Sequence, residues 1–340
     1  MKKVVITTVT GDMEPADLGF CQSHEHLWTA GYPGTVNSDL RIDDFEKSRA
    51  ELERYRMAGG SALVDAQPPG CGRDAAALKR LSEQSAVRII ASTGFHRMIY
   101  YPEGHWIYGA GAGALTRFFL EELSEGMYGG EITTLPDAAS GTRTSCRAGQ
   151  IKAALDAGPF SPQYEKCFTA AAEAAKESGA PLMVHIEKDS DPLALADFLI
   201  KRGLAPEGLI FCHLDRALAD MAVHRELCRR GIYLEYDTIG RPKYHDDEHE
   251  AGIILDILQD GCAGRLLMSL DTTRARLSSY GGRPGLDYIL TRFIPLLRRR
   301  GVTEAQIRAF FRENPARVFG RISSPSEKEQ QVGLSKNPVS

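Results

Sequence analysis

Short apolar runs alternate with helical patterns along most of the chain. Residues 61–66 and 87–92 have the length and apolar character of buried strands, and residues 73–84 between them follow helical spacing. An earlier strand at 18–23 is followed by a helix at 43–57. The later strand and helix pairs are 150–154 with 162–178, 181–186 with 192–202, 208–213 with 217–230, 232–236 with 247–259, and 265–270 with 286–299. The pattern therefore predicts eight strand–helix units.

Strands that alternate with helices form a parallel sheet. Eight such units within about 320 residues fit a single α/β domain, a (β/α)8 TIM barrel. A doubly wound open sheet is the alternative, and a G-x-G-x-x-G loop after an early strand would favour it, but none is present. We expect the barrel to occupy residues 1–322. Residues 323–340 are polar and lack periodicity, which predicts a disordered tail.

Composition and charge narrow the possible partners. The chain has 340 residues, 43% of them apolar, and a formal net charge of −4, which argues against nucleic acid and against a basic membrane-surface protein. No apolar run reaches the roughly 18 residues needed to span a bilayer, and the apolar run at residues 4–6 is too short for a signal peptide. The seven cysteines are scattered without a C-x-x-C pair, which predicts thiols in a reducing compartment. We expect a cytoplasmic protein.

Ionisable residues stand at the carboxyl ends of several predicted strands, where barrels of this type place their active sites. His24 and His26 follow the first strand and are two residues apart, so in an extended segment both imidazoles point to one face. His185 and His213 end the fifth and sixth strands, and Asp271 follows the eighth. Lys152 lies in the fourth strand among apolar neighbours.

Taken singly, each of these residues has a simple structural interpretation. A strand-end histidine can be a hydrogen-bonding residue, Asp271 can cap a turn, and Lys152 can extend to solvent. Because all six fall at the same end of their units, we interpret them as a metal site. Their number suggests two ions, one near His24, His26 and Asp271, the other near His185 and His213. The Lys152 ammonium would repel cations, but reaction with carbon dioxide would make it a carbamate, which is a metal ligand.

The order and spacing of these residues resemble the phosphotriesterase-like branch of the amidohydrolase superfamily. The resemblance covers nearly the whole chain. Its matching stretches are 17–27, 64–65, 70–74, 91–96, 148–152, 184–185, 212–216, 269–271, 280–282 and 313–319.

This resemblance implies a binuclear centre of two divalent ions, with zinc expected and manganese or cobalt as alternatives. Lys152, as N6-carboxylysine, would bridge the ions together with a hydroxide. The more buried ion would be held by His24, His26, Lys152 and Asp271, and the more exposed ion by Lys152, His185 and His213. The hydroxide would attack the substrate while Asp271, as the catalytic residue, moves its proton to the leaving oxygen. The family also implies a homodimer.

The loops resemble the subgroup that hydrolyses lactones of phosphorylated sugars. In that interpretation Lys243 and Arg274 bind the phosphate, and Phe95, His96 and Tyr100 of an aromatic loop at 93–113 contact the substrate. The chain departs from the subgroup at Leu277, where a tyrosine is common. Two alternatives therefore remain open: Arg276, Ser278 or Tyr280 takes the place of that tyrosine, or the substrate anion is a carboxylate or a sulfonate.

Two other functions remain open at this stage. The chain could be a phosphotriesterase, a carboxylesterase or an N-acyl amidase acting on another small substrate, or a non-enzymatic barrel that keeps its metal for stability. Structural zinc sites are usually closed and rich in cysteine, unlike this histidine- and carboxylate-based set. The sequence therefore predicts a metal-dependent hydrolase of a small anionic sugar lactone.

Overall fold

A computed structural model describes residues 3–31, 37–130, 132, 134–135 and 142–322. The tail predicted at 323–340 lies outside these ranges. Eight parallel strands form one sheet in which neighbours in sequence are neighbours in space. They are β3 (Cys21–Glu25), β4 (Ala62–Asp65), β5 (Arg88–Gly94), β6 (Gln150–Leu155), β7 (Leu182–Ile186), β8 (Leu209–Cys212), β9 (Tyr233–Tyr236) and β10 (Leu266–Met268).

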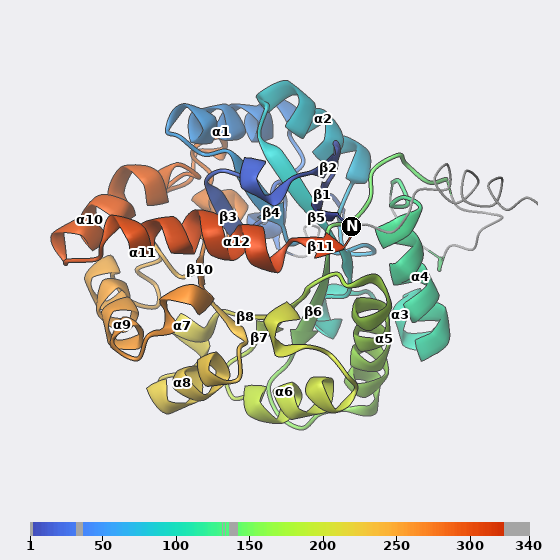
Figure 1. Ribbon diagram of the computed structural model, residues 1–340. Coiled ribbons are helices and arrows are strands. Elements are labelled where there is room, and N and C mark those ends of the chain that lie inside the picture. Colours follow the sequence, from blue (N-terminus) through green and yellow to red (C-terminus); the bar gives the residue numbers. More distant parts are fainter. Residues whose placement is uncertain (1–2, 32–36, 131, 133, 136–141, 323–340) are drawn as a thin grey trace, which may run out of the picture.

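The first and last strands of this sheet meet. The amide of Asp271, just beyond β10, donates a hydrogen bond of 3.1 Å to the carbonyl of His24 in β3. Helices surround the strands (Figure 1), so the predicted single (β/α)8 barrel is confirmed. The main helices are α1 (Phe45–Met57), α2 (Ala75–Ser85), α4 (Ala112–Ser124), α5 (Pro162–Ser178), α6 (Pro192–Lys201), α7 (Leu214–Ala217), α8 (Met221–Arg229), α9 (Asp247–Gln259), α10 (Ile294–Arg299), α11 (Glu304–Arg308) and α12 (Asn314–Val318).

Some boundaries differ from the sequence prediction. The helix expected at 217–230 is divided into α7 and α8, because the Asp220 side chain accepts a hydrogen bond from the Ala222 amide and begins a new helix there. The helix expected at 286–299 starts as a π-helix, Ile289–Phe293. The aromatic loop contains a short helix, α3 (Trp106–Gly109). Sequence periodicity also missed a small antiparallel sheet of β1 (Val4–Thr8), β2 (Gly11–Met13) and β11 (Arg321–Ile322).

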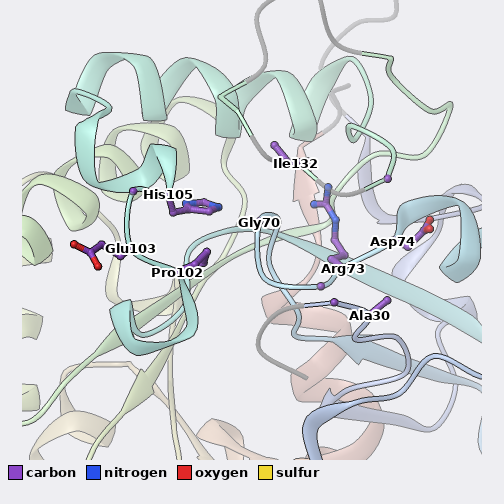
Figure 2. A pocket seen from close by; sticks show the side chains of 12 residues that line it. Ala30, Gly70, Arg73, Asp74, Pro102, Glu103, His105 and Ile132 are labelled. Atoms are coloured by element: carbon purple, nitrogen blue, oxygen red, sulfur yellow. The ribbon is translucent and has the colours of Figure 1, made fainter. Parts of the chain in front are cut away.

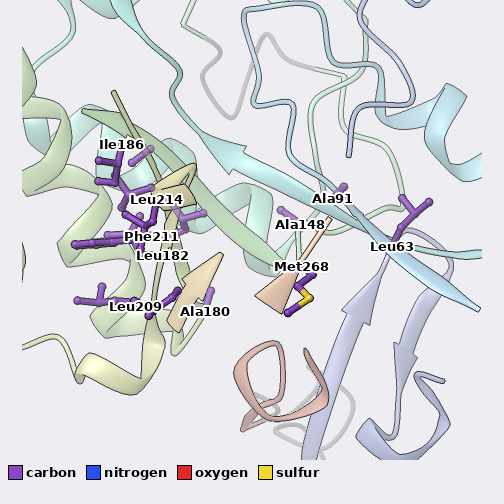
Figure 3. Close-up of a cluster of buried hydrophobic side chains, with 14 of the residues drawn as sticks. Leu63, Ala91, Ala148, Ala180, Leu182, Ile186, Leu209, Phe211, Leu214 and Met268 are labelled. Atoms are coloured by element: carbon purple, nitrogen blue, oxygen red, sulfur yellow. The ribbon is translucent and has the colours of Figure 1, made fainter. Parts of the chain in front are cut away.

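Side chains alternate across the barrel wall. Leu182, Leu209 and Phe211 belong to the large apolar layer between strands and helices (Figure 3), whereas Met183 and Ile210 belong to a separate apolar cluster within the barrel. This period of two directs Lys152, His185 and Glu235 to the inside, because their neighbours along each strand face the helices.

The amino ends of the strands are covered by apolar residues. Ile6, Val318 and Phe319 pack against the inner cluster, and α12 lies across this end of the barrel (Figure 1). The side chain of Asn314, at the start of α12, donates hydrogen bonds of 2.8 Å to the carbonyls of Ala263 and Leu266. The opposite end is therefore the one that offers polar groups to a ligand.

The cysteine prediction is wrong for one pair. Cys228 in α8 and Cys262 before β10 form a disulfide with their Cα atoms 6.2 Å apart. Their separation of 34 residues gave no signal in the sequence, because the barrel brings them together. In the part of the chain that the structure describes, none of the helices is both long and apolar enough to cross a membrane.

Candidate metal centre

The six predicted ligands meet at the carboxyl ends of the strands. Oδ1 of Asp271 lies 3.8 Å from Nε2 of His24 and 3.5 Å from Nε2 of His26. Nζ of Lys152 lies 3.0 Å from the same His24 nitrogen. The rings of His185 and His213 are 4.2 Å apart at their centroids, and the His213 ring is 4.9 Å from that of His24. The structure therefore places all six side chains in one cluster.

Unusual backbone geometry holds parts of this cluster. His213 and Asp271 both have positive φ angles, 65° and 50°, which are rare outside glycine and tend to occur at functional sites. Gly94 at the end of β5 has a φ of 104°, and a Cβ there would lie 1.9 Å from the carbonyl oxygen of Lys152. A glycine is required at this point for β5 and β6 to pair beside the lysine.

Two buried carboxylates orient the histidines. Oε2 of Glu235 lies 3.1 Å from Nδ1 of His24, and Oδ1 of Asp237 lies 2.7 Å from Nδ1 of His213. Each contact leaves Nε2 of its histidine facing the cluster, as in metal-bound histidines whose other nitrogen donates to a carboxylate. Sequence reasoning missed both acids, although they occupy alternate, inward positions at the end of β9.

Burial keeps the histidines uncharged. It lowers the pKa of His24 and of His185 to about 4, and in His24 the Lys152 ammonium lowers it further. Burial also lowers the pKa of His213 well below its usual value. A metal ion binds only the neutral imidazole, so these side chains are ready to act as ligands at neutral pH.

Two arginines bind the other oxygen of Asp271. Nη1 of Arg216 donates to Oδ2 at 2.9 Å, and Nη1 of Arg241 donates to it at 2.8 Å. Burial alone would raise the pKa of Asp271, but the two guanidiniums hold it well below the usual range. Oδ1 is left facing His24 and His26. Neither arginine was predicted, since each was one of several loop cations in the sequence.

The residues of this cluster suit divalent metal ions. His24, His26 and Asp271 offer ligand atoms that lie within 4.8 Å of one another, as do His213, Asp237 and Asp271. Nδ1 of His26 is buried and has no hydrogen-bond partner among the described residues. The donor set of imidazole nitrogens and carboxylate oxygens is one that zinc and manganese accept.

The aromatic loop places some of the predicted substrate residues beside this centre. The His96 ring lies 5.7 Å from that of His185, and Tyr100 packs edge-on against His96 at 4.6 Å. Phe95 is fully buried and packs against Phe168 of α5, in the layer between strands and helices. His96 and Tyr100 therefore remain positioned for substrate contact, while Phe95 packs in the apolar layer and contributes to the stability of the loop.

The two predicted anion-binding residues lie farther out. Lys243 is exposed, with Nζ 5.3 Å from the ring centre of Tyr244. Nη1 of Arg274 donates to the Arg41 carbonyl at 3.2 Å. Leu277 is fully buried, and Arg276 is held by the backbone carbonyls of Ile239 and Gly240, so neither side chain replaces the missing tyrosine.

A separate cavity of about 320 Å³ lies beside the loops that follow β3, β4 and β5 (Figure 2). Its lining includes Arg73, Glu103 and His105, and none of the six predicted ligands. Gly31, Gly130 and Ile132 also line it, and they adjoin residues outside the described ranges. The cavity therefore adds nothing to the description of the metal centre.

Comparisons with known proteins agree with this geometry. The model of the phosphotriesterase family matches residues 4–319. A phospho-furanose lactonase of Mycoplasmopsis synoviae is 29% identical over 336 residues, covering 94% of this chain and 92% of its own. An N-acetyltaurine hydrolase of Rattus norvegicus is 28% identical over 352 residues, covering 91% of this chain and 96% of its own. The crystal structure of a lactonase from Listeria monocytogenes superposes with a TM-score of 0.84 at 26% identity, and the match covers 94% of this chain and 100% of the lactonase chain.

Proposed function

Because the chain belongs to the phosphotriesterase family, we propose that it is a metal-dependent lactonase that opens a small phosphorylated sugar lactone. One observation supports this most strongly: four histidines, Lys152 and Asp271 form a buried cluster beside the guanidiniums of Arg216 and Arg241. The resemblance to a phospho-furanose lactonase and to a solved lactonase supports the choice of a lactone ester.

The ligands fall into two groups around the buried lysine. In the proposal His24, His26 and Asp271 would hold one ion, His185 and His213 would hold the other, and Lys152, as N6-carboxylysine, would be a ligand of both. Two divalent ions, proposed to be zinc, would activate a water molecule and polarise the ester carbonyl when bound. Converting Lys152 to a carbamate replaces a cation by an anion next to His24, which removes the repulsion between the lysine and the ions.

The proposed proton path passes through Asp271. A carboxylate whose pKa is held low is a weak proton acceptor, and the two arginines on Oδ2 hold it low. We therefore propose that Asp271 serves mainly as an oriented ligand, and that it accepts a proton only when one arginine turns toward the substrate. In this proposal the arginine that turns is Arg241, which lies in the loop between β9 and α9 that also carries Lys243.

The substrate anion is assigned to the same side of the barrel mouth. Arg241 and Lys243 lie on one loop and Arg274 on the next, after the strands where barrels often bind phosphate. A phosphate dianion suits guanidinium and ammonium donors. Neutral phosphotriesters gain nothing from these cations, so they fit the site less well as natural substrates.

The experiment compares a phosphorylated furanose lactone with its unphosphorylated counterpart. Lys243→Ala and Arg274→Ala should each lower kcat/KM for the phosphorylated lactone by roughly tenfold, the loss of one charged hydrogen bond, and leave the neutral lactone unchanged. Lys188→Ala, which removes an exposed lysine on the loop after β7, is the control. If the ratio of kcat/KM for the phosphorylated lactone to kcat/KM for the neutral lactone stays at the wild-type value in both variants, the proposal that these residues bind a phosphate is wrong.

A second function has support of its own. The N-acetyltaurine hydrolase of the rat covers this chain to a similar extent, and a sulfonate would also suit the cations at the mouth. Leu277 also favours an anion with fewer contacts than a phosphate dianion. Hydrolysis of N-acetyltaurine in preference to every phosphorylated lactone tested would favour this amidase over the lactonase.

A further inference from the structure

A second polar cluster lies apart from the six predicted ligands. Asp215 belongs to α7 just after β8, Glu250 to the first turns of α9, and His245 to the loop that joins β9 to α9. Each side chain offers one ligand atom, and the three atoms lie within 4.8 Å of one another. Nε2 of His245 is 2.5 Å from Oε2 of Glu250. Three separate segments of the chain therefore converge on one point.

The carboxylates of this cluster are buried and only partly satisfied. Glu250 is fully buried, and within the described ranges its Oε1 has no hydrogen-bond partner. Asp215 is 6% exposed, and its Oδ2 accepts a 2.6 Å hydrogen bond from the Thr238 amide. Its Oδ1 lacks a partner by the same criterion. A buried oxygen without a donor destabilises the fold unless a proton or a cation satisfies it.

Charge balance points the same way. Burial raises the pKa of Glu250, and the neighbouring Asp215, Asp237 and Asp247 raise it further. Arg216 is already hydrogen-bonded to Asp271. Asp215, Asp237 and Glu250 are thus three buried carboxyl groups, and Arg216, which lies 3.9 Å from Asp237, is shared with the metal centre.

We propose that Asp215, His245 and Glu250 form a third divalent-metal site, distinct from the binuclear centre. One imidazole nitrogen and two carboxylate oxygens make a donor set that zinc accepts, with water completing the coordination. His245 has a side chain that is 12% exposed, which gives an ion a path of entry from the loop. An ion there would neutralise the buried acids.

The position of the site suggests its role. His245 follows Arg241 and Lys243 on the same loop, while Glu250 and Asp215 lie on helices packed on the barrel. An ion that joins all three would hold this loop against the barrel, and with it the cations near Asp271. The role in substrate binding rests on the proposed function, whereas the binding of the ion does not.

The test counts zinc ions in protein dialysed against buffered zinc and bicarbonate. Wild type should hold about three ions per chain, and Glu250→Gln and His245→Asn about two each. His249→Ala is the matched control, because His249 is exposed on the first turn of α9 with its ring 5.1 Å from that of His245. It should hold as many ions as wild type. Equal zinc content in wild type and both cluster variants would overturn the proposal.

Lys152→Ala separates this site from the binuclear centre. Without the bridging ligand, we expect about one zinc ion to remain, and none in Lys152→Ala combined with Glu250→Gln. Zinc should raise the Tm of the single variant and leave that of the double variant unchanged, because an ion stabilises only a fold that binds it. A folded Lys152→Ala protein that binds no zinc would overturn the third site, whereas wild type holding about one ion would contradict the binuclear centre alone.

Discussion

Arg241 donates a 2.8 Å hydrogen bond to Oδ2 of Asp271, so the oxygen that faces away from the histidines is held by a guanidinium. Arg216 donates to the same oxygen from α7. These contacts leave Oδ1 directed at His24 and His26. They link Asp271, the proposed metal ligand after β10, to helix α7 and to the loop between β9 and α9.

Removing the hydrogen bond from Arg241 should make the Asp271 side chain less well oriented. Arg241→Met keeps an unbranched, flexible side chain but deletes the guanidinium donors, so Asp271 loses part of its orientation. We expect zinc affinity or kcat/KM to fall roughly 10- to 100-fold, the usual effect of losing a partner of a metal ligand. Equilibrium dialysis and steady-state kinetics measure the two quantities. Arg225→Met, which removes an arginine paired with Asp256 and Asp260 on the surface, should change neither.

Glu235 should affect metal binding as strongly as a ligand does, although it contacts only His24 among the six proposed ligands. Glu235→Gln places an amide where Nδ1 of His24, the Cys212 thiol and the Ser269 hydroxyl now meet a carboxylate. We expect zinc affinity to fall roughly 10- to 100-fold while the fold is retained. Glu226→Gln on the surface of α8 is the control. Unchanged zinc affinity in Glu235→Gln would show that His24 keeps its orientation without the acid.

The barrel and the clustering of the six proposed ligands were predictable because they follow simple rules. Strand and helix alternation gave the eight units, and the period of two inside each strand brought Lys152 and His185 to the interior. The same rule could have identified Glu235. Arg216 and Arg241 were not predictable, because the direction of a loop cation depends on turns such as the one that Arg276 stabilises through the Ile239 and Gly240 carbonyls.

Most of the predictions that failed concern contacts between residues that are far apart in the chain. The N-terminal strands of the small sheet are short, and β1 pairs with β11 from the opposite end of the described chain, which periodicity in one window cannot show. The Cys228–Cys262 disulfide depends on the same kind of long-range contact. Phe95 was predicted to contact substrate from its place in an aromatic loop. It follows the last residue of β5, however, and its side chain packs against Phe168 of α5.

Gly94 should tolerate no side chain. An alanine Cβ would lie 1.9 Å from the Lys152 carbonyl oxygen, in a backbone conformation with a φ of 104°. Gly94→Ala should therefore lower the free energy of unfolding by at least about 2 kcal/mol and reduce the zinc content as Lys152 is displaced. Gly104→Ala is the control, since its φ is 79° but its surroundings are open. Gly104→Ala should lower the free energy of unfolding by about 1 kcal/mol. Chemical denaturation measures this free energy for both variants.

Metal retention should depend on pH in a way that reflects buried histidines. Their pKa is lowered from 6.5 to about 4 in His24 and His185, so both stay neutral until the pH approaches 4. Protonation competes with metal only below that point, and zinc should be retained as the pH falls through 6.5 and lost as it falls toward 4. Zinc content after dialysis at each pH measures this. Loss with a midpoint near 6.5 would mean that the histidines titrate as exposed groups.

The most direct measurement of the central claim is hydrolysis of a phosphorylated furanose lactone by wild type and by Lys152→Ala, each loaded with zinc in bicarbonate and analysed for metal. The account predicts that wild type opens the lactone with the binuclear centre occupied, and that Lys152→Ala loses at least about 1000-fold in kcat together with those ions. Full activity in a Lys152→Ala protein that has lost the binuclear zinc, or no lactone hydrolysis by fully loaded wild type, would contradict it.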